Sequence, residues 1–468
     1  MEVDKFLNEK ATRSAKLAMA FARWALLRGR DIRPDRPIPL RPAPSPIIDG
    51  LEVLEKGEGP ALAEEGLVVG TVRMGYGHHR MAYSAYTWAL AKRIPVYLHD
   101  LLAIDSDEAR LIAGIDKYYS ALSRLCSEFG GPVDRLWGGA MSRGDANSLR
   151  VSCMLAGELR ALMAAIPNHL PMISSYPLNG QMAVACGFRR VVNLVPDNFP
   201  QHFLLVPGAM NLLQSPAAYG LFREMGVPAA SLGVAGHWVS REIAENAKRD
   251  CEARIRRAAE RRPRRILLPI GGAGAQRKYV SALLRAIAPK LARGEMLLFL
   301  NTGDHDAIFA WFKSLLEEQK VPFEAVESWK GLLEFCGRHE LSGSEPGAAK
   351  PATVFHFASR FEAFAATERL MRVSDILATK PSELGFFPIP KLFFRRVGDH
   401  EAGAVLRAQE LGEGTAECRD AARAERMLAL LCDESDLFVR LNENIARNAE
   451  RGIYDGSRRA VELAMSLP

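Results

Sequence analysis

Two series of alternating strand-like and helix-like segments constrain the fold of this chain more than any other feature. The first series runs from residue 66 to 234, and the second runs from residue 266 to 394. In both, short apolar runs with the length of a buried strand are separated by segments with helical periodicity. This alternation predicts parallel sheets covered by helices on both faces, and 468 residues are enough for two such domains.

The individual elements follow from the apolar runs and the turn residues between them. Strands are predicted at residues 66–74, 95–98, 171–174, 190–195, 231–234, 266–270, 296–300, 353–357, 376–379 and 391–394. Helices are predicted at residues 10–30, 81–91 and 278–291 and over the tail 421–467. Residues 325–350 are interpreted as a surface insertion, because they end in a Gly-Ser-Glu-Pro-Gly stretch.

Four segments make up the predicted domain organisation. Residues 1–60 form an N-terminal helix and a linker that is extended because it is rich in proline. Residues 61–262 form the first Rossmann-like domain, and a basic helical run before Pro263 marks the joint. Residues 263–440 form the second Rossmann-like domain, and residues 441–468 form a C-terminal helix.

The N-terminal helix is expected to be amphipathic. Five basic residues fall on one broad side at 100° per residue: Lys10, Arg13, Lys16, Arg23 and Arg30. Met19, Phe21 and Leu26 fall on the other side, and Trp24 lies among the basic residues. Such a helix either lies on an anionic membrane surface or packs on its own domain with a solvated basic face.

Composition excludes several classes of protein. With 48% hydrophobic and 25% charged residues, the chain is predicted to be globular rather than disordered, collagen-like or coiled-coil. We find no transmembrane segment or signal peptide, and seven scattered cysteines without a CxxC pair indicate a reducing cytoplasm. A net charge of +6 permits contact with anionic lipid or phosphate but is too small to indicate nucleic-acid binding.

A glycine-containing turn after the first predicted strand is the first candidate site. Gly75 and Gly77 allow a ligand to approach the backbone, and the helix that follows offers unpaired N–H groups. His78 lies in this turn and can act as a base near neutral pH, with His79 and Arg80 directly after it.

A second glycine-rich turn opens the second domain after the strand at residues 266–270. Gly271, Gly272 and Gly274 precede Arg277, so backbone N–H groups and a cation are available for a diphosphate. The turn is not a P-loop, because no Gly-Lys-Ser/Thr follows at the required spacing.

Charged residues also follow two later strands. Lys380, Ser382 and Glu383 come after the strand at residues 376–379, and Asp399 and Glu401 come after the strand at residues 391–394. In the first domain, Asp197 follows the strand at residues 190–195 and is a second acid, or an orienting partner of His78. No metal site is predicted, because Asp197 and His202 alone make a poor ligand set.

In their order along the chain these pieces resemble the two-domain glycosyltransferases that make monogalactosyldiacylglycerol and related glycolipids. They resemble more distantly the lipid-linked N-acetylglucosaminyltransferase of peptidoglycan synthesis. The resemblance runs over about residues 66–450 and is carried by a series of short motifs. In the first domain these are residues 75–82, 197–202, 214–215 and 236–239. In the second domain they are residues 271–274, 374–375, 379–383, 390 and 398–401.

The resemblance implies a GT-B fold, in which two Rossmann-like parallel-sheet domains face a cleft. It implies an inverting, metal-independent hexosyltransferase that uses a nucleotide sugar, a UDP-sugar, and a diacylglycerol-like or other hydrophobic acceptor at the cytoplasmic face of a membrane. His78 would be the base, with Asp197 as its partner or alternative. Donor contacts would come from Gly271, Gly272, Gly274, Arg277, Lys380, Ser382, Glu383, Asp399 and Glu401, and the acceptor-side loop from Gly75, Gly77, His79 and Arg80.

One departure from the family leaves an alternative open. The glycolipid synthases have several further residues between their Lys-Pro and Ser-Glu elements, whereas here Ser382 follows Pro381 directly. A degenerate relative that binds sugar nucleotide or lipid without transfer is therefore the alternative function. An isomerase of the same fold, acting on a free nucleotide sugar, is a third hypothesis.

Overall fold

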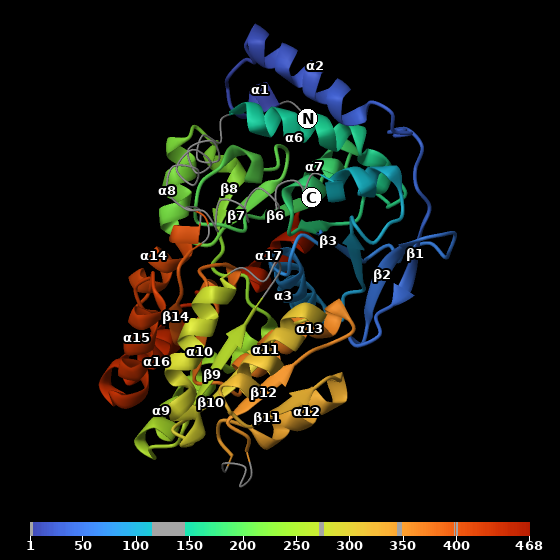
Figure 1. Ribbon diagram of the computed structural model, residues 1–468. Helices are drawn as coiled ribbons and strands as arrows, with labels where there is room; N and C mark the ends of the chain where they lie inside the picture. The colour runs from blue at the N-terminus through green and yellow to red at the C-terminus, as the bar shows by residue number, and fades with distance from the viewer. Residues whose placement is uncertain (1–2, 115–145, 271–275, 344–348, 397, 399–400) are drawn as a thin grey trace. The chain divides into compact units, whose positions relative to one another are not determined.

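The computed structural model describes residues 3–114, 146–270, 276–343, 349–396, 398 and 401–468 (Figure 1). The chain divides into two compact units. Unit 1 comprises Met1–Arg241 together with Asp455–Pro468, and unit 2 comprises Glu242–Tyr454. Each unit contains one sheet, so the predicted pair of α/β parallel-sheet domains is confirmed.

The boundary between the units lies at Arg241, whereas the sequence places the joint near Pro263. Helix α9 (Arg241–Ala259) accounts for this difference, because two of its arginines, Arg254 and Arg257, are buried in unit 2. The Arg257 guanidinium pairs with Asp375 at 3.2 Å, and both side chains are almost inaccessible to solvent. Residues 242–262 are therefore part of the second domain rather than the end of the first.

The C-terminal helical tail is divided between the units. Helices α15 (Ala421–Asp433) and α16 (Ser435–Glu450) belong to unit 2, whereas α17 (Gly456–Ser466) belongs to unit 1. Helix α17 packs on α3 (Gly77–Ala91), where Ser457 Oγ lies 2.7 Å from Ser84 Oγ. The helical character predicted for residues 421–467 is confirmed.

Unit 1 is built on an eight-stranded sheet in the order β1-β2-β4-β3-β5-β6-β7-β8, parallel except for β1. Its strands are β1 (Leu40–Pro44), β2 (Leu51–Lys56), β3 (Leu67–Thr71), β4 (Val96–Asp100), β5 (Met172–Ser174), β6 (Val191–Leu194), β7 (Met210–Leu213) and β8 (Leu232–Val234). Its other helices are α1 (Val3–Phe6), α2 (Arg13–Leu27), α6 (Ala146–Glu158), α7 (Pro177–Ala185), α8 (Pro216–Glu224), η1 (Arg160–Leu162), η2 (His202–Leu204) and η3 (Ala229–Ser231).

The two faces of this sheet pack against different helices. Val68, Met172 and Val191 lie in register on neighbouring strands and share a buried core with α7. Helices α3 and α17 pack on β3, β4, β5 and β6 and cover the other face. The period-2 alternation of each buried strand therefore supplies both layers of the core.

The structure corrects the interpretation of residues 31–60 as an extended linker. Strand β2 pairs parallel with β4, and Leu51 and Leu54 are buried. Strand β1 pairs antiparallel with β2 at the edge of the sheet, where Pro42 and Pro44 can be accommodated because an edge strand has unpaired positions. Strand β7 is a further element that the apolar runs did not predict.

Unit 2 contains a six-stranded sheet in the order β11-β12-β10-β9-β13-β14, and all its pairings are parallel. Its strands are β9 (Arg264–Pro269), β10 (Met296–Asn301), β11 (Phe323–Val326), β12 (Ala352–Phe355), β13 (Ile376–Thr379) and β14 (Lys391–Phe393). Its remaining helices are α10 (Arg277–Ala292), α11 (Asp306–Glu318), α12 (Trp329–Arg338), α13 (Arg360–Met371), η4 (Glu383–Phe386) and α14 (Ala402–Glu410).

Residues 325–350 are not a simple surface insertion, and this expectation is corrected. Strand β11 begins at Phe323 and α12 follows it, so this stretch supplies a complete strand and helix of the sheet. Helix α12 packs through Phe335, whose ring lies 5.0 Å from Phe299 and 4.9 Å from Phe355. Strand β11 is a short edge strand that contains Glu324 and is only partly buried, which explains why the sequence pattern is weak.

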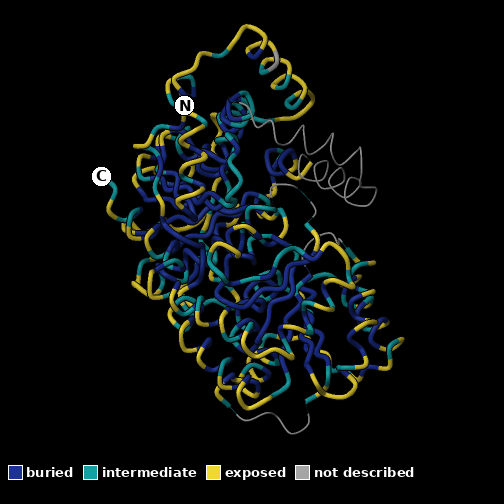
Figure 2. The backbone as a smooth tube through the Cα atoms, turned by 90° about the vertical axis from the view of Figure 1, so that its left-hand side faces the viewer, coloured by how far each residue is buried: buried dark blue, intermediate teal, exposed yellow. Residues whose placement is uncertain are grey.

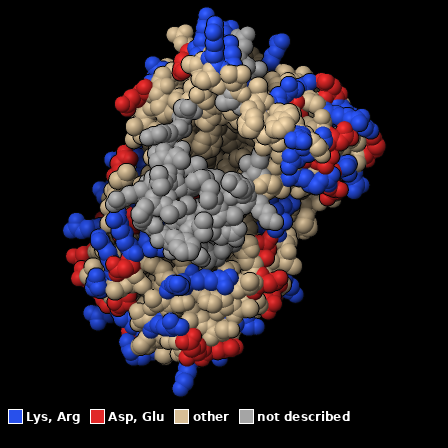
Figure 3. All heavy atoms as spheres, turned by 45° about the horizontal axis from the view of Figure 1, so that its top comes forward, with Lys and Arg blue, Asp and Glu red and all other residues tan. Residues whose placement is uncertain are grey.

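Charges are mixed over the surface. On the face drawn in Figure 3, lysine and arginine side chains lie among aspartate and glutamate side chains. Among the described helices, none is both long and apolar enough to cross a membrane.

Strand β4 carries a buried histidine with a consequence for stability. His99 is fully buried, and its Nε2 donates to Leu162 O at 2.9 Å. Burial lowers the pKa of His99 from 6.5 to about 4. His99 is therefore protonated near pH 6.5 in the unfolded chain but only near pH 4 in the folded chain. The free energy of unfolding should consequently decrease as the pH is lowered from 6.5 to 4.

We expect the free energy of unfolding to contain a contribution from His99 that changes by up to about 3 kcal/mol between pH 6.5 and 4. The measurement is urea unfolding across this range for the wild type and for His99→Gln, whose amide can still donate to Leu162 O. The variant should lack this part of the pH dependence, whereas His169→Gln at an exposed site should keep it. Identical pH profiles for His99→Gln and wild type would contradict the assignment.

Candidate functional site

The order of the strands in unit 1 identifies one edge of the sheet as the candidate site. The chain passes from β3 to β4 on one side and later to β5 on the other side of β3. In open parallel sheets, ligands bind beyond the carboxyl ends of the strands at such a reversal, which is called the topological switch point. His78 follows β3, and Ser175 directly follows β5.

The structure brings His78 and the end of β5 together. His78 Nδ1 lies 2.6 Å from Ser175 O, and its ring meets the ring of Tyr176 edge-on at 4.9 Å. Because a carbonyl oxygen can only accept, Nδ1 carries the proton and donates it. The lone pair of the neutral ring is then on Nε2, which is the arrangement that a general base requires.

The carbonyl that orients His78 is itself fixed. Ser175 N and Ser175 Oγ both donate to Gly70 O of β3, each at 2.9 Å. A Cβ on Gly70 would lie 2.5 Å from Met172 Cε and 2.8 Å from Asn179 Cβ, so only glycine fits this close approach. No sequence pattern indicated Ser175, because its contact to His78 uses a backbone carbonyl, and none indicated the ring contact of Tyr176.

The predicted acceptor-side loop adopts the expected turn before α3. Gly75 has φ +79°, a conformation that favours glycine, and Gly77 is the first residue of the helix. His79 and Arg80 lie within the fold, with 2% and 4% of their surface exposed. His79 Nε2 lies 3.6 Å from Asp100 Oδ2 at the end of β4, and Arg80 lies over the ring of Tyr76 at 5.3 Å.

Asp197 lies at the same edge of the sheet, after β6, and is half-buried. Its segment is held from two sides, because Gln214 Nε2 donates to Pro196 O at 2.7 Å and Trp238 Nε1 donates to Val195 O at 2.9 Å. The role of Asp197 as a partner of His78 or as a second base stays a prediction.

Unit 2 has a second switch point, between β9 and β13. From β9 the chain continues to β10 on one side, and it returns later to β13 on the other. Three predicted donor residues, Gly271, Gly272 and Gly274, lie outside the described residues. The residue that follows this loop, Gln276, has φ +70°, which is strained for a non-glycine residue, and its amide donates to Arg395 O.

Lys380 and Glu401 form an ion pair at this switch point. Glu401 is 6% exposed, whereas Lys380, directly after β13, is 41% exposed and remains accessible to a ligand. Glu383 opens the short helix η4, and Ser382 O closes the turn by accepting from Gly385 N at 2.9 Å. Asp399 lies outside the described residues.

Arg277 is the first residue of α10 and is exposed. Its guanidinium lies over the ring of Trp311 of α11 at 5.6 Å. The ring of Trp311 therefore holds the Arg277 guanidinium beside α11. The spacing of the glycine-rich turn did not predict this contact.

The motifs in the sequence did not indicate the polar side chains that follow β10 and β12. Thr302 Oγ1 donates to Phe355 O at 2.8 Å, and His356 Nε2 lies 3.0 Å from Asp306 Oδ1. The end of the strand predicted at residues 296–300 was an available signal for Thr302, since loops at this edge carry the ligands of such sheets. His356 falls inside the strand predicted at residues 353–357, whereas β12 ends at Phe355.

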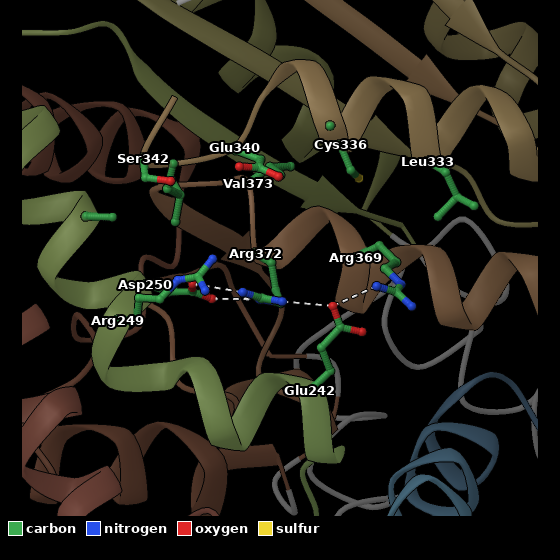
Figure 4. A pocket seen from close by; sticks show the side chains of 13 residues that line it. Glu242, Arg249, Asp250, Leu333, Cys336, Glu340, Ser342, Arg369, Arg372 and Val373 are labelled. Atoms are coloured by element: carbon green, nitrogen blue, oxygen red, sulfur yellow. Dashed lines mark hydrogen bonds and ion pairs between the residues drawn. The ribbon is translucent and has the colours of Figure 1, made fainter. Parts of the chain in front are cut away.

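A cavity of about 270 Å³ lies away from these residues, between α9, α12 and α13 of unit 2 (Figure 4). Arg372 is held between Asp250 at 2.9 Å and Glu242 at 2.8 Å, and Arg369 pairs with the same Glu242 at 2.6 Å. Of the predicted site residues that the structure describes, none lines this cavity. Its charged lining residues are thus mainly engaged with one another.

Fold and site together define a two-unit α/β protein in which the switch point of each sheet carries polar side chains. The model of the family "Domain of unknown function (DUF6938)" matches residues 227–465, just over half of the chain, and the chain belongs to this family. A second model, "Domain of unknown function (DUF6937)", matches residues 45–224. A search of the curated proteins finds no match.

Several solved structures resemble the chain in fold. UDP-GlcNAc 2-epimerase from Neisseria meningitidis is 9% identical with a TM-score of 0.48, over 85% of this chain and 98% of that one. Anabaena HepE, solved with UDP and glucose, is 12% identical with a TM-score of 0.40, over 86% and 100%. Trehalose 6-phosphate synthase from Burkholderia multivorans is 12% identical with a TM-score of 0.42, over 86% and 98%. These values are too low to transfer a ligand to this chain.

Proposed function

We propose that this protein is a glycosyltransferase that moves a hexosyl group from a nucleotide sugar to a lipid or other hydrophobic acceptor. The observation that supports this proposal most is the hydrogen bond from His78 Nδ1 to Ser175 O at 2.6 Å. In the neutral imidazole this bond places the proton on Nδ1 and the basic lone pair on Nε2, at a switch point where a substrate hydroxyl group would bind.

In the proposed reaction, His78 Nε2 accepts the proton of the acceptor hydroxyl group. The acceptor oxygen forms a bond to the anomeric carbon while the bond from this carbon to the diphosphate oxygen breaks. The electron pair leaves with the diphosphate, and a single displacement inverts the anomeric centre. Asp197 would stabilise the protonated imidazole, or serve as the alternative base.

The donor is assigned to the switch point of unit 2. The ammonium group of Lys380, whose side chain is 41% exposed, and the guanidinium of Arg277 would neutralise the leaving diphosphate, together with the backbone of Gly271, Gly272 and Gly274. No metal ion is needed for this step in the proposal. Glu383 would accept from the ribose hydroxyl groups, and Asp399 and Glu401 would bind the sugar.

The finer parts of the proposal come from the resemblance to the glycolipid synthases. A UDP-sugar is the proposed donor, and a diacylglycerol-like lipid is the proposed acceptor. Such an acceptor would require the protein to work at the inner face of a membrane. The direct succession of Pro381, Ser382 and η4 favours one alternative, a protein that binds sugar nucleotide or lipid without transfer.

The proposal is tested by incubating the full-length protein with radiolabelled UDP-sugars and a lipid extract. A labelled lipid product supports transfer. Binding of a UDP-sugar without product, across a broad panel of acceptors, would support the binding-only alternative. Conversion of the sugar in the absence of any acceptor would instead identify an isomerase.

Replacement of Lys380 by alanine should weaken the binding of a UDP-sugar by about 10–100-fold, because one charge-assisted hydrogen bond contributes about 1.5–3 kcal/mol. Isothermal titration calorimetry measures this change. Lys330→Ala, which removes an exposed lysine of α12 in the same unit, is the control and should bind like the wild type. Equal affinities for Lys380→Ala and Lys330→Ala would contradict the role of Lys380.

A further inference from the structure

Helix α2 exposes three large apolar side chains in one row. Leu17 is 72% exposed, Phe21 is 67% exposed and Trp24 is 55% exposed. Their spacing of four and three residues places them on the same side of the helix, and the two rings lie 5.9 Å apart. We call these three residues the α2 apolar row.

This row is unusual for the chain. The other exposed large apolar side chains among the described residues are distributed one to an element over α8, β8, α12, α14 and α15: Leu221, Val234, Leu333, Leu406 and Leu430. Single exposed apolar residues are ordinary, whereas a contiguous group indicates a binding surface.

The orientation of α2 is fixed by the opposite side of the helix. Ala15 is buried, Leu26 and Leu27 pack on the core of unit 1, and Arg23 pairs with Glu158 of α6 at 2.8 Å. The apolar row consequently points away from the unit, and Figure 2 draws most of this helix as exposed.

The segment before α2 is fixed as well. The buried Arg150 of α6 donates to Asp4 Oδ1 at 2.8 Å and to Glu9 O at 2.7 Å. Asp4 in turn accepts from Ala11 N at 3.0 Å, just before the helix begins. The helix is thus held in place from its amino end.

The arrangement corrects the two faces predicted for residues 10–30. Phe21 lies beside Trp24 on the exposed side, and the helix contacts its own unit mainly through alanine and leucine residues. The exposed side is therefore both apolar and basic, so neither of the two expected arrangements describes it fully.

Positive charges surround the row, and helix α2 contains no aspartate or glutamate. Arg13 lies four residues before Leu17, and Arg28 lies four residues after Trp24, with its guanidinium 5.0 Å from the centre of the indole ring. Both ends of the row thus carry a cation, and Lys16 lies next to Leu17.

We propose that the α2 apolar row docks on the surface of a membrane that contains anionic lipid. Aromatic and aliphatic side chains would enter the boundary between headgroups and acyl chains, and the flanking arginines would contact lipid phosphates. The absence of acidic residues in α2 favours this surface over a protein partner. With 15 residues the helix can lie in the interface but is too short to cross it.

This inference deepens the lipid-acceptor part of the proposed function. The reason for docking, which is access to a lipid acceptor, rests on the proposed function, whereas the docking itself does not. Vesicle binding can be measured without any nucleotide sugar, so failure of docking and failure of transfer are distinguishable. A protein that docks but does not transfer would keep the inference and lose the proposed activity.

The test is co-sedimentation of the full-length protein with phosphatidylcholine vesicles and with vesicles that contain 30% phosphatidylglycerol. We expect binding to the anionic vesicles and a decrease of at least tenfold in the partition coefficient for Leu17→Ala/Phe21→Ala/Trp24→Ala. The control Leu333→Ala/Leu406→Ala/Leu430→Ala removes comparable exposed apolar groups elsewhere and should bind like the wild type.

Two further measurements separate insertion from simple attraction. Brominated acyl chains should quench a component of the tryptophan fluorescence that Trp24→Phe lacks. Arg13→Gln/Arg28→Gln should weaken binding to the anionic vesicles several-fold and leave the weaker binding to neutral vesicles unchanged.

Three outcomes would overturn the inference. The first is no binding to either kind of vesicle, and the second is equal binding by the triple variant and its control. The third is a wild-type dimer in light scattering that the triple variant converts to a monomer without any vesicle binding. That result would assign the row to a contact between copies of this chain.

Discussion

Replacement of His78 by alanine is expected to lower the rate of sugar transfer by about 10²–10⁴-fold, the usual contribution of a general base. The affinity for the nucleotide sugar should stay unchanged, because the donor is assigned to residues of unit 2. The reason lies in the geometry of His78: its Nδ1 lies 2.6 Å from Ser175 O, so Nε2 is the nitrogen that would accept the proton in the proposed reaction. The measurement is the initial rate with labelled UDP-sugar and acceptor lipid.

His169→Ala is the matched control for this experiment, since it removes an exposed histidine of the same unit. It should transfer sugar like the wild type. A His78→Ala protein with wild-type activity would contradict the base assignment.

Replacement of Glu413 by glutamine is expected to destabilise unit 2 by about 3–5 kcal/mol, because it leaves a buried ammonium group without its counter-charge. Lys391 and Glu413 are both fully buried, with Nζ 2.9 Å from Oε2. Lys391 also donates to Phe387 O at 2.7 Å, and burial lowers its pKa. Glu413 further accepts from Asn448 Nδ2 at 2.8 Å and from the hydroxyl of Tyr454.

The measurement is urea unfolding of Glu413→Gln and of the double variant Lys391→Met/Glu413→Gln. The double variant removes the unpaired charge and should regain part of the lost stability. An exposed pair in the same unit, Arg285 and Glu318 at 3.1 Å, provides the control, and Glu318→Gln should cost less than about 1 kcal/mol. A loss below about 1 kcal/mol for Glu413→Gln, or no recovery in the double variant, would contradict this prediction.

The sheets were predictable from the sequence because the strands of a parallel sheet are buried on both faces. Runs such as Leu67–Thr71 and Met296–Asn301 are completely buried and are almost entirely apolar. Strands at the edges of a sheet do not follow this rule. Strand β1 contains Pro42 and Pro44, and β11 is only partly buried, so neither produces an apolar run.

Charged residues inside unit 2 were not predictable as core residues. Arg257, Lys391 and Glu413 have partners that are distant in the sequence, and each would be read locally as a solvated charge. Their burial depends on the tertiary fold, which brings residues 413 and 391 into contact across the edge of the sheet. The domain boundary was misplaced for the same reason, since Arg254 and Arg257 of α9 are buried in unit 2.

The candidate site was predictable in part. Glycines after a strand indicated a turn at each switch point, and the ends of the predicted strands placed His78 after β3 and Lys380 after β13. The partners of these residues were not predictable. Ser175 acts through its carbonyl oxygen, and Glu401 pairs with Lys380 across 21 residues of sequence, a distance that no local pattern encodes.

A crystal structure of the full-length protein with bound UDP tests the central claim most directly. The account predicts UDP at the switch point of unit 2, with its ribose hydroxyl groups on the carboxylate of Glu383. Its diphosphate should lie against Lys380 and the glycine-rich turn after β9. UDP bound elsewhere, for example in the cavity between α9, α12 and α13, or no bound UDP at saturating concentration, would contradict the account.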